Sequence, residues 1–147
     1  MFRGVTRLTL DAKGRLSIPA KHRETLVREA GGRLMATVES RNCVLIYPEP
    51  QWLLIEAKVS ALPTTNPKVR AMQDLIIGNV CEMELDSAGR VLVQPELREL
   101  VGLDKDVALV GQGTKFALWD SVKWGARLDE AIEMYQGGLG PDFDISL

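Results

Sequence analysis

The stretch Asp11-Ala12-Lys13-Gly14-Arg15 decides how this sequence is organised, because the chain contains it twice. The second copy, Asp86-Ser87-Ala88-Gly89-Arg90, follows 75 positions later. Each copy lies between short segments that alternate apolar and polar residues, a pattern typical of half-buried β-strands. Glycine reaches a positive φ without steric cost, and an aspartate carboxylate can accept hydrogen bonds from N–H groups within a turn. We therefore predict two β-hairpin tips, each presenting an arginine to solvent.

The residues around the first tip predict a small unit of strands and one helix. Its expected elements are strands at 5–10 and 16–18, paired with each other as a hairpin, a helix at 20–30, and a second strand pair at 34–38 and 43–47. Pro19 suits the first turn of the helix. We expect Leu26 and Val27 to be the inward residues of that helix.

The same order of elements returns after Gly78, so the chain is an internal repeat. Beyond the second helix the offset shortens to 72, where Tyr47 aligns with Trp119 and Trp52 with Trp124. Amphipathic spacing also predicts helices at 51–61, 68–77 and 121–135, the first two packed as an antiparallel pair. The predicted division is a first repeat at 4–50, a helical connection at 51–77, a second repeat at 78–120, a C-terminal helix at 121–136 and a flexible tail at 137–147.

The composition is that of a globular protein in a reducing compartment. The 147 residues are 46% hydrophobic and 26% charged, and the apolar runs are far shorter than a membrane helix needs. No signal-like segment follows Met1, which predicts a cytoplasmic protein. Cys43 and Cys81 lie alone in apolar stretches, so we expect buried, reduced thiols rather than a metal site or a disulfide.

The charge is unevenly distributed along the chain. The formal net charge is −2, yet residues 1–23 hold six Lys or Arg and one Asp, a balance of +5. Residues 104–147 hold four basic and eight acidic residues, a balance of −4. This asymmetry indicates a basic working face contributed by the first repeat and an acidic, solvated surface elsewhere.

No arrangement of residues favours catalysis. The single histidine, His22, lies between Lys21 and Arg23, which favours an exposed position on a helix. The segment 111–113 (Gly-Gln-Gly) lacks the Lys and Ser/Thr of a P-loop. Asp11 and Asp86 are explained more simply as turn-shaping residues than as a carboxylate dyad. We therefore expect a protein that is not an enzyme, with no metal, cofactor or small-molecule substrate.

The basic residues of the first repeat favour nucleic acid as the partner. Arginine can donate two hydrogen bonds to guanine, and a two-stranded ribbon fits the major groove of DNA. Lys13 and Arg15 on the first tip, with Arg3 and Arg7 on the preceding strand, could contact phosphates and bases. Arg15 and Arg90 could instead form ion pairs with the aspartates of their own turns, and the two roles are compatible.

The motifs of both tips carry a resemblance to a known family. They are Phe2-Arg3-Gly4, Asp11-x-Lys13-Gly14-Arg15-x-x-x-Pro19, Asp86-x-x-Gly89-Arg90 and Pro95-x-Leu97-Arg98. The chain resembles the MraZ family, transcriptional regulators of the bacterial division and cell-wall gene cluster. The resemblance implies an α+β fold of two tandem AbrB-like swapped-hairpin units, packed as an intrachain pseudo-dimer with peripheral helices. It also implies a nucleoid-associated, ring-shaped homo-oligomer that binds double-stranded DNA at direct repeats in the promoter of its own operon, as a repressor.

The resemblance assigns DNA contact to Lys13, Gly14, Arg15 and Arg90. The chemistry of the turns themselves predicts that Asp11, Gly14, Asp86 and Gly89 shape them. The second tip departs from the first, since Ala88 replaces the basic residue and Gln94 stands at the position of Pro19. Residues 78–98 hold two basic and four acidic residues, so we expect the first repeat to supply most of the attraction to DNA. Two alternatives are an antitoxin-like module that binds a protein, and a purely structural assembly protein.

Overall fold

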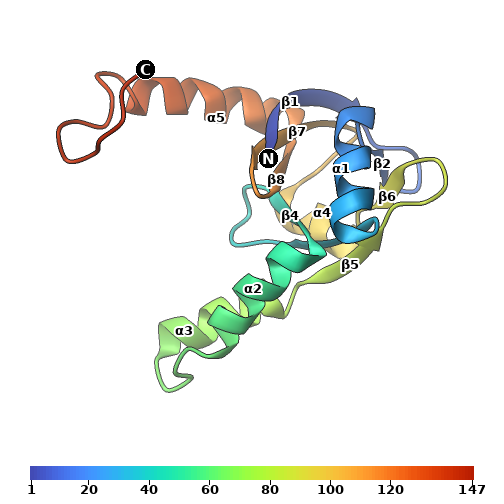
Figure 1. Cartoon of the computed structure of the whole chain (residues 1–147), viewed down its shortest axis with the longest axis horizontal. Coiled ribbons are helices and arrows are strands. Elements are labelled where there is room, and N and C mark those ends of the chain that lie inside the picture. The colour runs from blue at the N-terminus through green and yellow to red at the C-terminus, as the bar shows by residue number, and fades with distance from the viewer.

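Two repeats with the same order of elements build the computed structural model, which describes residues 1–147 (Figure 1). The first repeat contains β1 (Phe2–Thr9), β2 (Arg15–Ser17), α1 (Ala20–Ala30), β3 (Arg33–Thr37) and β4 (Val44–Pro48), and helix α2 (Glu49–Ser60) follows. The connection contains α3 (Pro67–Met72) and a π-helical turn, η1 (Gln73–Ile77). The second repeat contains β5 (Cys81–Glu84), β6 (Arg90–Leu92), α4 (Pro95–Val101), β7 (Asp106–Gly113) and β8 (Phe116–Asp120), and helix α5 (Ser121–Met134) follows.

The repeats exchange their first strands across a six-stranded antiparallel sheet with the order β1-β7-β8-β4-β3-β5. Strand β1 pairs with β7 of the second repeat, from Phe2 opposite Gly113 to Thr9 opposite Asp106. Strand β5 pairs in the same way with β3 of the first repeat. The fold is therefore α+β, with two tandem AbrB-like units interlocked as an intrachain pseudo-dimer, as the resemblance implied.

The exchange corrects the predicted hairpin between residues 5–10 and 16–18. Strand β2 does not pair with β1 but with β6, and these two strands form a separate two-stranded ribbon. The prediction was wrong because alternation fixes which face of a strand is buried and not which strand lies beside it. The second strand pair was predicted correctly, since β3 and β4 are joined by a local turn and pair antiparallel.

Each face of the sheet carries its own apolar core. The inner core lies between the sheet, the ribbon and the helices α1 and α4, and it contains Leu16, Leu26, Val91 and Leu97. The outer core is centred on the fully buried Trp52 of α2. The aromatic pairs predicted to be equivalent have similar geometry. The ring centroids of Tyr47 and Trp52 are 5.7 Å apart, and those of Trp119 and Trp124 are 5.8 Å apart.

Helix α1 corrects two predictions about its faces. His22 is only 7% exposed, and its ring packs against Phe2 and Phe116 with centroid distances of 5.6 and 5.0 Å. Val27, expected to face inward, is 59% exposed. The buried residues His22, Leu26 and Ala30 are four apart, so they form one stripe along the helix, and Val27 lies off that stripe.

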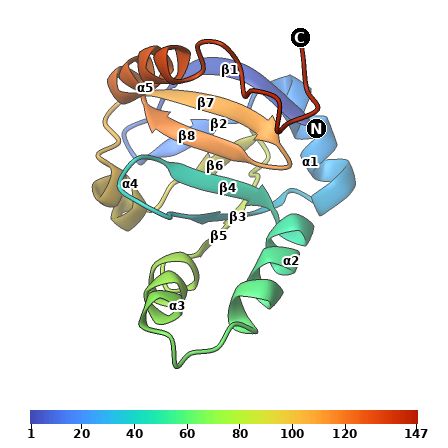
Figure 2. The ribbon, with the colours of Figure 1, turned by 90° about the vertical axis from the view of Figure 1, so that its left-hand side faces the viewer.

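The remaining helices form two arms that project from the body. Helix α2 runs beside α3 and η1 (Figures 1 and 2), and the side-chain amide of Gln73 donates to the carbonyl of Val59 at 3.0 Å, so the predicted helix pair is present. Helix α5 extends away from the sheet (Figure 1), and its apolar residues Leu128, Ile132 and Tyr135 remain exposed. None of the helices combines the length and apolar character required to cross a membrane.

Candidate nucleic-acid interface

The first tip is a turn held by backbone hydrogen bonds and one carboxylate. The N–H of Asp11 donates to the carbonyl of Arg15 at 3.0 Å, and the N–H of Gly14 donates to the carbonyl of Asp11 at 2.9 Å. The Oδ1 atom of Asp11 accepts from the N–H groups of Lys13 and Arg15 at 2.9 and 2.8 Å. Gly14 has a φ of +83°, a value that favours glycine. The chain therefore turns at Asp11–Arg15, although the strands on either side of the turn do not pair with each other as the predicted hairpin required.

The second tip repeats this geometry. The Oδ1 atom of Asp86 accepts from the N–H groups of Ala88 and Arg90, each at 2.9 Å, and Gly89 has a φ of +75°. The N–H of Gly89 donates to the carbonyl of Asp86 at 3.0 Å. The loss of the basic residue at position 88 therefore leaves the shape of the turn intact.

Both tip arginines form ion pairs with the aspartates of their own turns. The Nε atom of Arg15 lies 2.6 Å from Oδ2 of Asp11, and that of Arg90 lies 3.1 Å from Oδ2 of Asp86. One Nη atom of Arg90 also lies 3.9 Å from Oδ2 of Asp11, which links the two tips. Because these pairs use Nε of Arg15, both Nη groups of that residue remain without a hydrogen bond in the chain. Ion pairing thus orients Arg15 and leaves its outer donors available.

The hydrogen bonds at each turn keep its carboxylate ionised. The pKa of Asp11 is lowered to about 2, chiefly by the hydrogen bond from the backbone N–H of Arg15 and then by the Arg15 guanidinium. The pKa of Asp86 is also lowered, chiefly by the backbone N–H of Arg90. Both carboxylates are therefore ionised at neutral pH.

The ribbon places the two tip arginines on one face. In its register Arg15 is opposite Leu92, Leu16 is opposite Val91, and Ser17 is opposite Arg90. Because side chains alternate along a strand, Leu16 and Val91 enter the inner core while Arg15 and Arg90 share the outer face. They are diagonal neighbours on that face, a separation of roughly 7–8 Å between positions. The structure thus brings together Lys13, Gly14, Arg15 and Arg90.

Arg3 and Arg7 do not join this group. Both lie on β1, whose inward residues are Phe2 and Leu8, so their side chains point to the opposite face of that strand. The Nη1 atom of Arg7 donates to Oγ of Ser121 at 2.6 Å, which holds it against the start of α5. Contact between these two residues and DNA remains a prediction, and it would require the duplex to extend along β1.

Two further arginines lie at the tips, although no role was predicted for them. The Nε atom of Arg23 donates to the carbonyl of Ile18 at 2.7 Å, and that of Arg98 donates to the carbonyl of Val93 at 3.0 Å. Their partners are the residues that follow β2 and β6. The 75-residue offset that relates Arg23 to Arg98 was the available signal, since it equals the offset between the tips.

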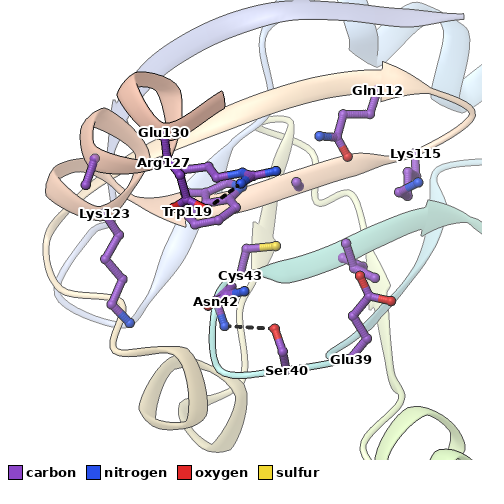
Figure 3. A pocket seen from close by; sticks show the side chains of 13 residues that line it. Glu39, Ser40, Asn42, Cys43, Gln112, Lys115, Trp119, Lys123, Arg127 and Glu130 are labelled. Carbon is purple, nitrogen blue, oxygen red and sulfur yellow. Dashed lines mark hydrogen bonds and ion pairs between the residues drawn. The ribbon is translucent and has the colours of Figure 1, made fainter. Parts of the chain in front are cut away.

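The outer face of the sheet has a hollow of about 620 Å³ beneath α5 (Figure 3). Trp119, Lys123 and Arg127 line it on one side and Cys43 on the other. Burial raises the pKa of the Cys43 thiol to about 11, so this cysteine is a neutral thiol rather than a thiolate nucleophile at neutral pH. Cys43 is buried, as predicted, whereas Cys81 is only partly buried.

The fold and the tips define a class: a tandem-repeat, swapped-hairpin protein whose repeats jointly form one arginine-bearing ribbon. The family model described as "MraZ protein, putative antitoxin-like" matches residues 1–75 and again 76–136. The chain belongs to the MraZ family.

Its similarity to curated relatives extends over nearly the whole chain. It is 47% identical to the "Transcriptional regulator MraZ" of Nitrosomonas eutropha over 144 residues, which cover 98% of this chain and 97% of the relative. It is 50% identical to the protein of the same name from Chromobacterium violaceum over 139 residues, 95% and 94% of the two chains. The protein of that name from Escherichia coli O127:H6 is 45% identical over 141 residues, 95% and 93% of the two chains.

Proposed function

We propose that this protein is a sequence-specific, DNA-binding transcriptional regulator that inserts the β2–β6 ribbon into the major groove. The observation that carries the proposal is the pair Arg15 and Arg90 on one outer face of a two-stranded ribbon. A ribbon of this kind fits the major groove, where arginine can donate two hydrogen bonds to guanine. The names of the relatives support a role in transcription.

The finer proposal concerns the site and the outcome of binding. The protein acts as a repressor at short direct repeats in the promoter of its own division and cell-wall operon, in the cytoplasm and on the nucleoid. Lys13 and Arg15 supply most of the attraction, because Arg90 is the only basic residue in the second turn itself. Arg3 and Arg7 contact phosphates beyond the tips. The domain boundaries at 50, 77, 120 and 136 remain predictions that go with this model.

A single ribbon contacts few phosphates, so we propose that several subunits bind together in a ring. Linked binding sites gain affinity through effective concentration when the spacing of the DNA repeats matches the assembly. The exposed apolar residues Leu128, Ile132 and Tyr135 of α5 support a subunit contact, because nothing in the chain covers them. Sedimentation analysis of Ile132→Asp should show smaller species than the wild type. An unchanged distribution would exclude this face.

The test of the proposed function compares Arg15→Ala with the wild type on a fragment of the promoter of its own operon. We expect retention in a gel shift to be lost at protein concentrations that saturate the wild type. Arg28→Ala is the matched control, because Arg28 is an exposed arginine on α1 that pairs only with Glu29. Wild-type affinity should also fall steeply with salt, since neutralised phosphates release counterions. Normal retention of Arg15→Ala, or binding insensitive to salt, would contradict the proposal.

A second candidate is an antitoxin-like module that binds a protein, which the wording of the family description favours. This candidate predicts that the purified protein retains one stoichiometric protein partner from extract of its own organism. It also predicts that Arg15→Ala does not reduce that retention. Binding of promoter DNA without such a partner would favour the regulator.

A further inference from the structure

Each tip is held by a residue of the other repeat. The carbonyl of Gly14 accepts a hydrogen bond from the N–H of Val93 at 3.0 Å, and the carbonyl of Gly89 accepts from the N–H of Ile18 at 3.0 Å. Gly14 and Ile18 belong to the first repeat, whereas Gly89 and Val93 belong to the second. The backbone of each tip is therefore fixed by the strand that leaves the opposite tip.

An arginine of the opposite repeat also lies across each tip glycine. A Cβ atom added to Gly14 would lie 2.6 Å from Cζ and 2.8 Å from Nε of Arg98. A Cβ atom added to Gly89 would lie 2.6 Å from Nη1 and 2.8 Å from Nε of Arg23. These approaches are closer than any real Cβ contact, so each guanidinium occupies the space that the missing side chain leaves. The glycines are thus required for this contact as well as for their positive φ.

The same strand end anchors both parts of the contact. Val93 donates its N–H to Gly14 and accepts from Nε of Arg98 through its carbonyl. Ile18 has the equivalent pair of bonds, to Gly89 and to Arg23. Each hydrogen bond of this arrangement has a counterpart 75 positions away, so the two tips are related by an approximate two-fold exchange.

Resting on the proposed function, we propose that Arg98 is a positioning residue for the first tip and Arg23 for the second. The two tips then form one DNA-binding unit, in which each repeat holds the tip glycine of the other. Neither Arg23 nor Arg98 forms an ion pair, so each also adds positive charge beside the opposite tip. Arg23, from the basic first repeat, therefore places a positive charge beside the second tip, where Ala88 stands at the position that Lys13 has in the first tip.

The first test uses the free protein and does not depend on DNA. In ¹H–¹⁵N spectra, Arg98→Ala should shift the amide signal of Gly14 more than that of Gly89, and Arg23→Ala should do the reverse. Arg28→Ala, the exposed arginine on α1, should shift neither. If Arg98→Ala only destabilised the fold, it would shift the Gly14 and Gly89 amide signals equally, and that result would overturn the proposal. So would an unmoved Gly14 signal in Arg98→Ala.

The second test measures affinity for the promoter fragment. Arg98→Ala should weaken binding at least about tenfold, the usual effect of losing a hydrogen bond that involves a charged group. The double variant with Arg15→Ala should bind little more weakly than Arg15→Ala alone, because Arg98 acts through the first tip. Arg98→Lys keeps the charge but loses the planar guanidinium, so it should restore binding only in part. Full restoration by lysine, or additive losses in the double variant, would overturn the positioning role.

Failure of the proposed function would give a different result. If the wild type binds no DNA, the regulator proposal fails, whereas the expected amide shifts would still show that Arg98 positions the first tip and Arg23 the second. If the wild type binds DNA and those amide shifts are absent, the positioning roles fail and the regulator proposal stands.

Discussion

Replacement of Leu16 by alanine should loosen both tips at once. Leu16 has no exposed surface, and it lies opposite Val91 at the centre of the ribbon, where both side chains enter the inner core. Removal of a fully buried leucine side chain costs about 2–5 kcal/mol, because apolar contacts are lost and a cavity remains. For a chain of this length, each kcal/mol lowers the melting temperature by roughly 2–4 °C. A cost of about 3 kcal/mol thus predicts a fall of roughly 6–12 °C.

The matched control is Leu92→Ala. Leu92 belongs to the same ribbon, opposite Arg15, but its side chain lies on the outer face and is 40% exposed. A surface substitution of this kind usually changes stability by less than about 0.5 kcal/mol. Both variants should be melted by circular dichroism at one protein concentration, because assembly makes the melting temperature depend on concentration. Equal falls for the two variants, or a fall below about 2 °C for Leu16→Ala, would refute the assignment of the ribbon faces.

Three further predictions concern the turns and the buried histidine. Asp11→Asn should keep the turn, because an amide oxygen can still accept from the N–H groups of Lys13 and Arg15. Asp11→Ala removes this acceptor, so it should shift the NMR signal of the Gly14 amide more than Asp11→Asn does. Equal shifts in the two variants would contradict this prediction. The pKa of the Asp11 carboxyl, measured by NMR, should be about 2, so its contribution to stability is present above pH 3.8 and is lost as the pH falls through 2. Arg15→Ala should raise this pKa only in part, because the hydrogen bond from the backbone N–H of residue 15 remains. Burial lowers the pKa of His22, so the unfolded state takes up a proton at a higher pH than the folded state, and the free energy of unfolding should fall as the pH drops below 6.5. The part of this fall that is due to the histidine should vanish in His22→Phe. An unchanged pH dependence in that variant would assign the effect to other groups.

The sequence was sufficient to predict the tips because their signals are local. Gly14 and Asp11 act within five residues, through a positive φ and a carboxylate that accepts from nearby N–H groups. The pair β3 and β4 is local in the same sense, since its strands are joined by a short turn. Repetition of the motif strengthened both predictions, because a second copy 75 positions later is unlikely to arise by chance.

The exposed position predicted for His22 was wrong because its charged neighbours and its place on the helix indicate opposite exposures. Its charged neighbours Lys21 and Arg23 favoured exposure, yet it precedes Leu26 by four residues and Ala30 by eight. This spacing places His22 on the buried stripe of the helix, where it packs against two phenylalanine rings. The position of a residue on the helical face therefore predicted burial better than the charge of its neighbours.

The partner of β1 could not be predicted from the alternation of residues alone, because the duplication makes two pairings look alike. Both repeats contain the same kinds of strand, so β1 presents the same alternating face to β3 of its own repeat or to β7 of the other. The exchanged pairing has a consequence that alternation does not encode: each repeat lacks its own edge strand and receives one from the other repeat.

Because the repeats are interlocked, the net charge of a segment of sequence does not give the charge of the surface around that segment. Residues 78–98 are acidic as a stretch of sequence, but the tip they form lies beside Arg23 of the basic repeat. The unit that determines the electrostatics of the ribbon is therefore the interlocked pair and not either repeat.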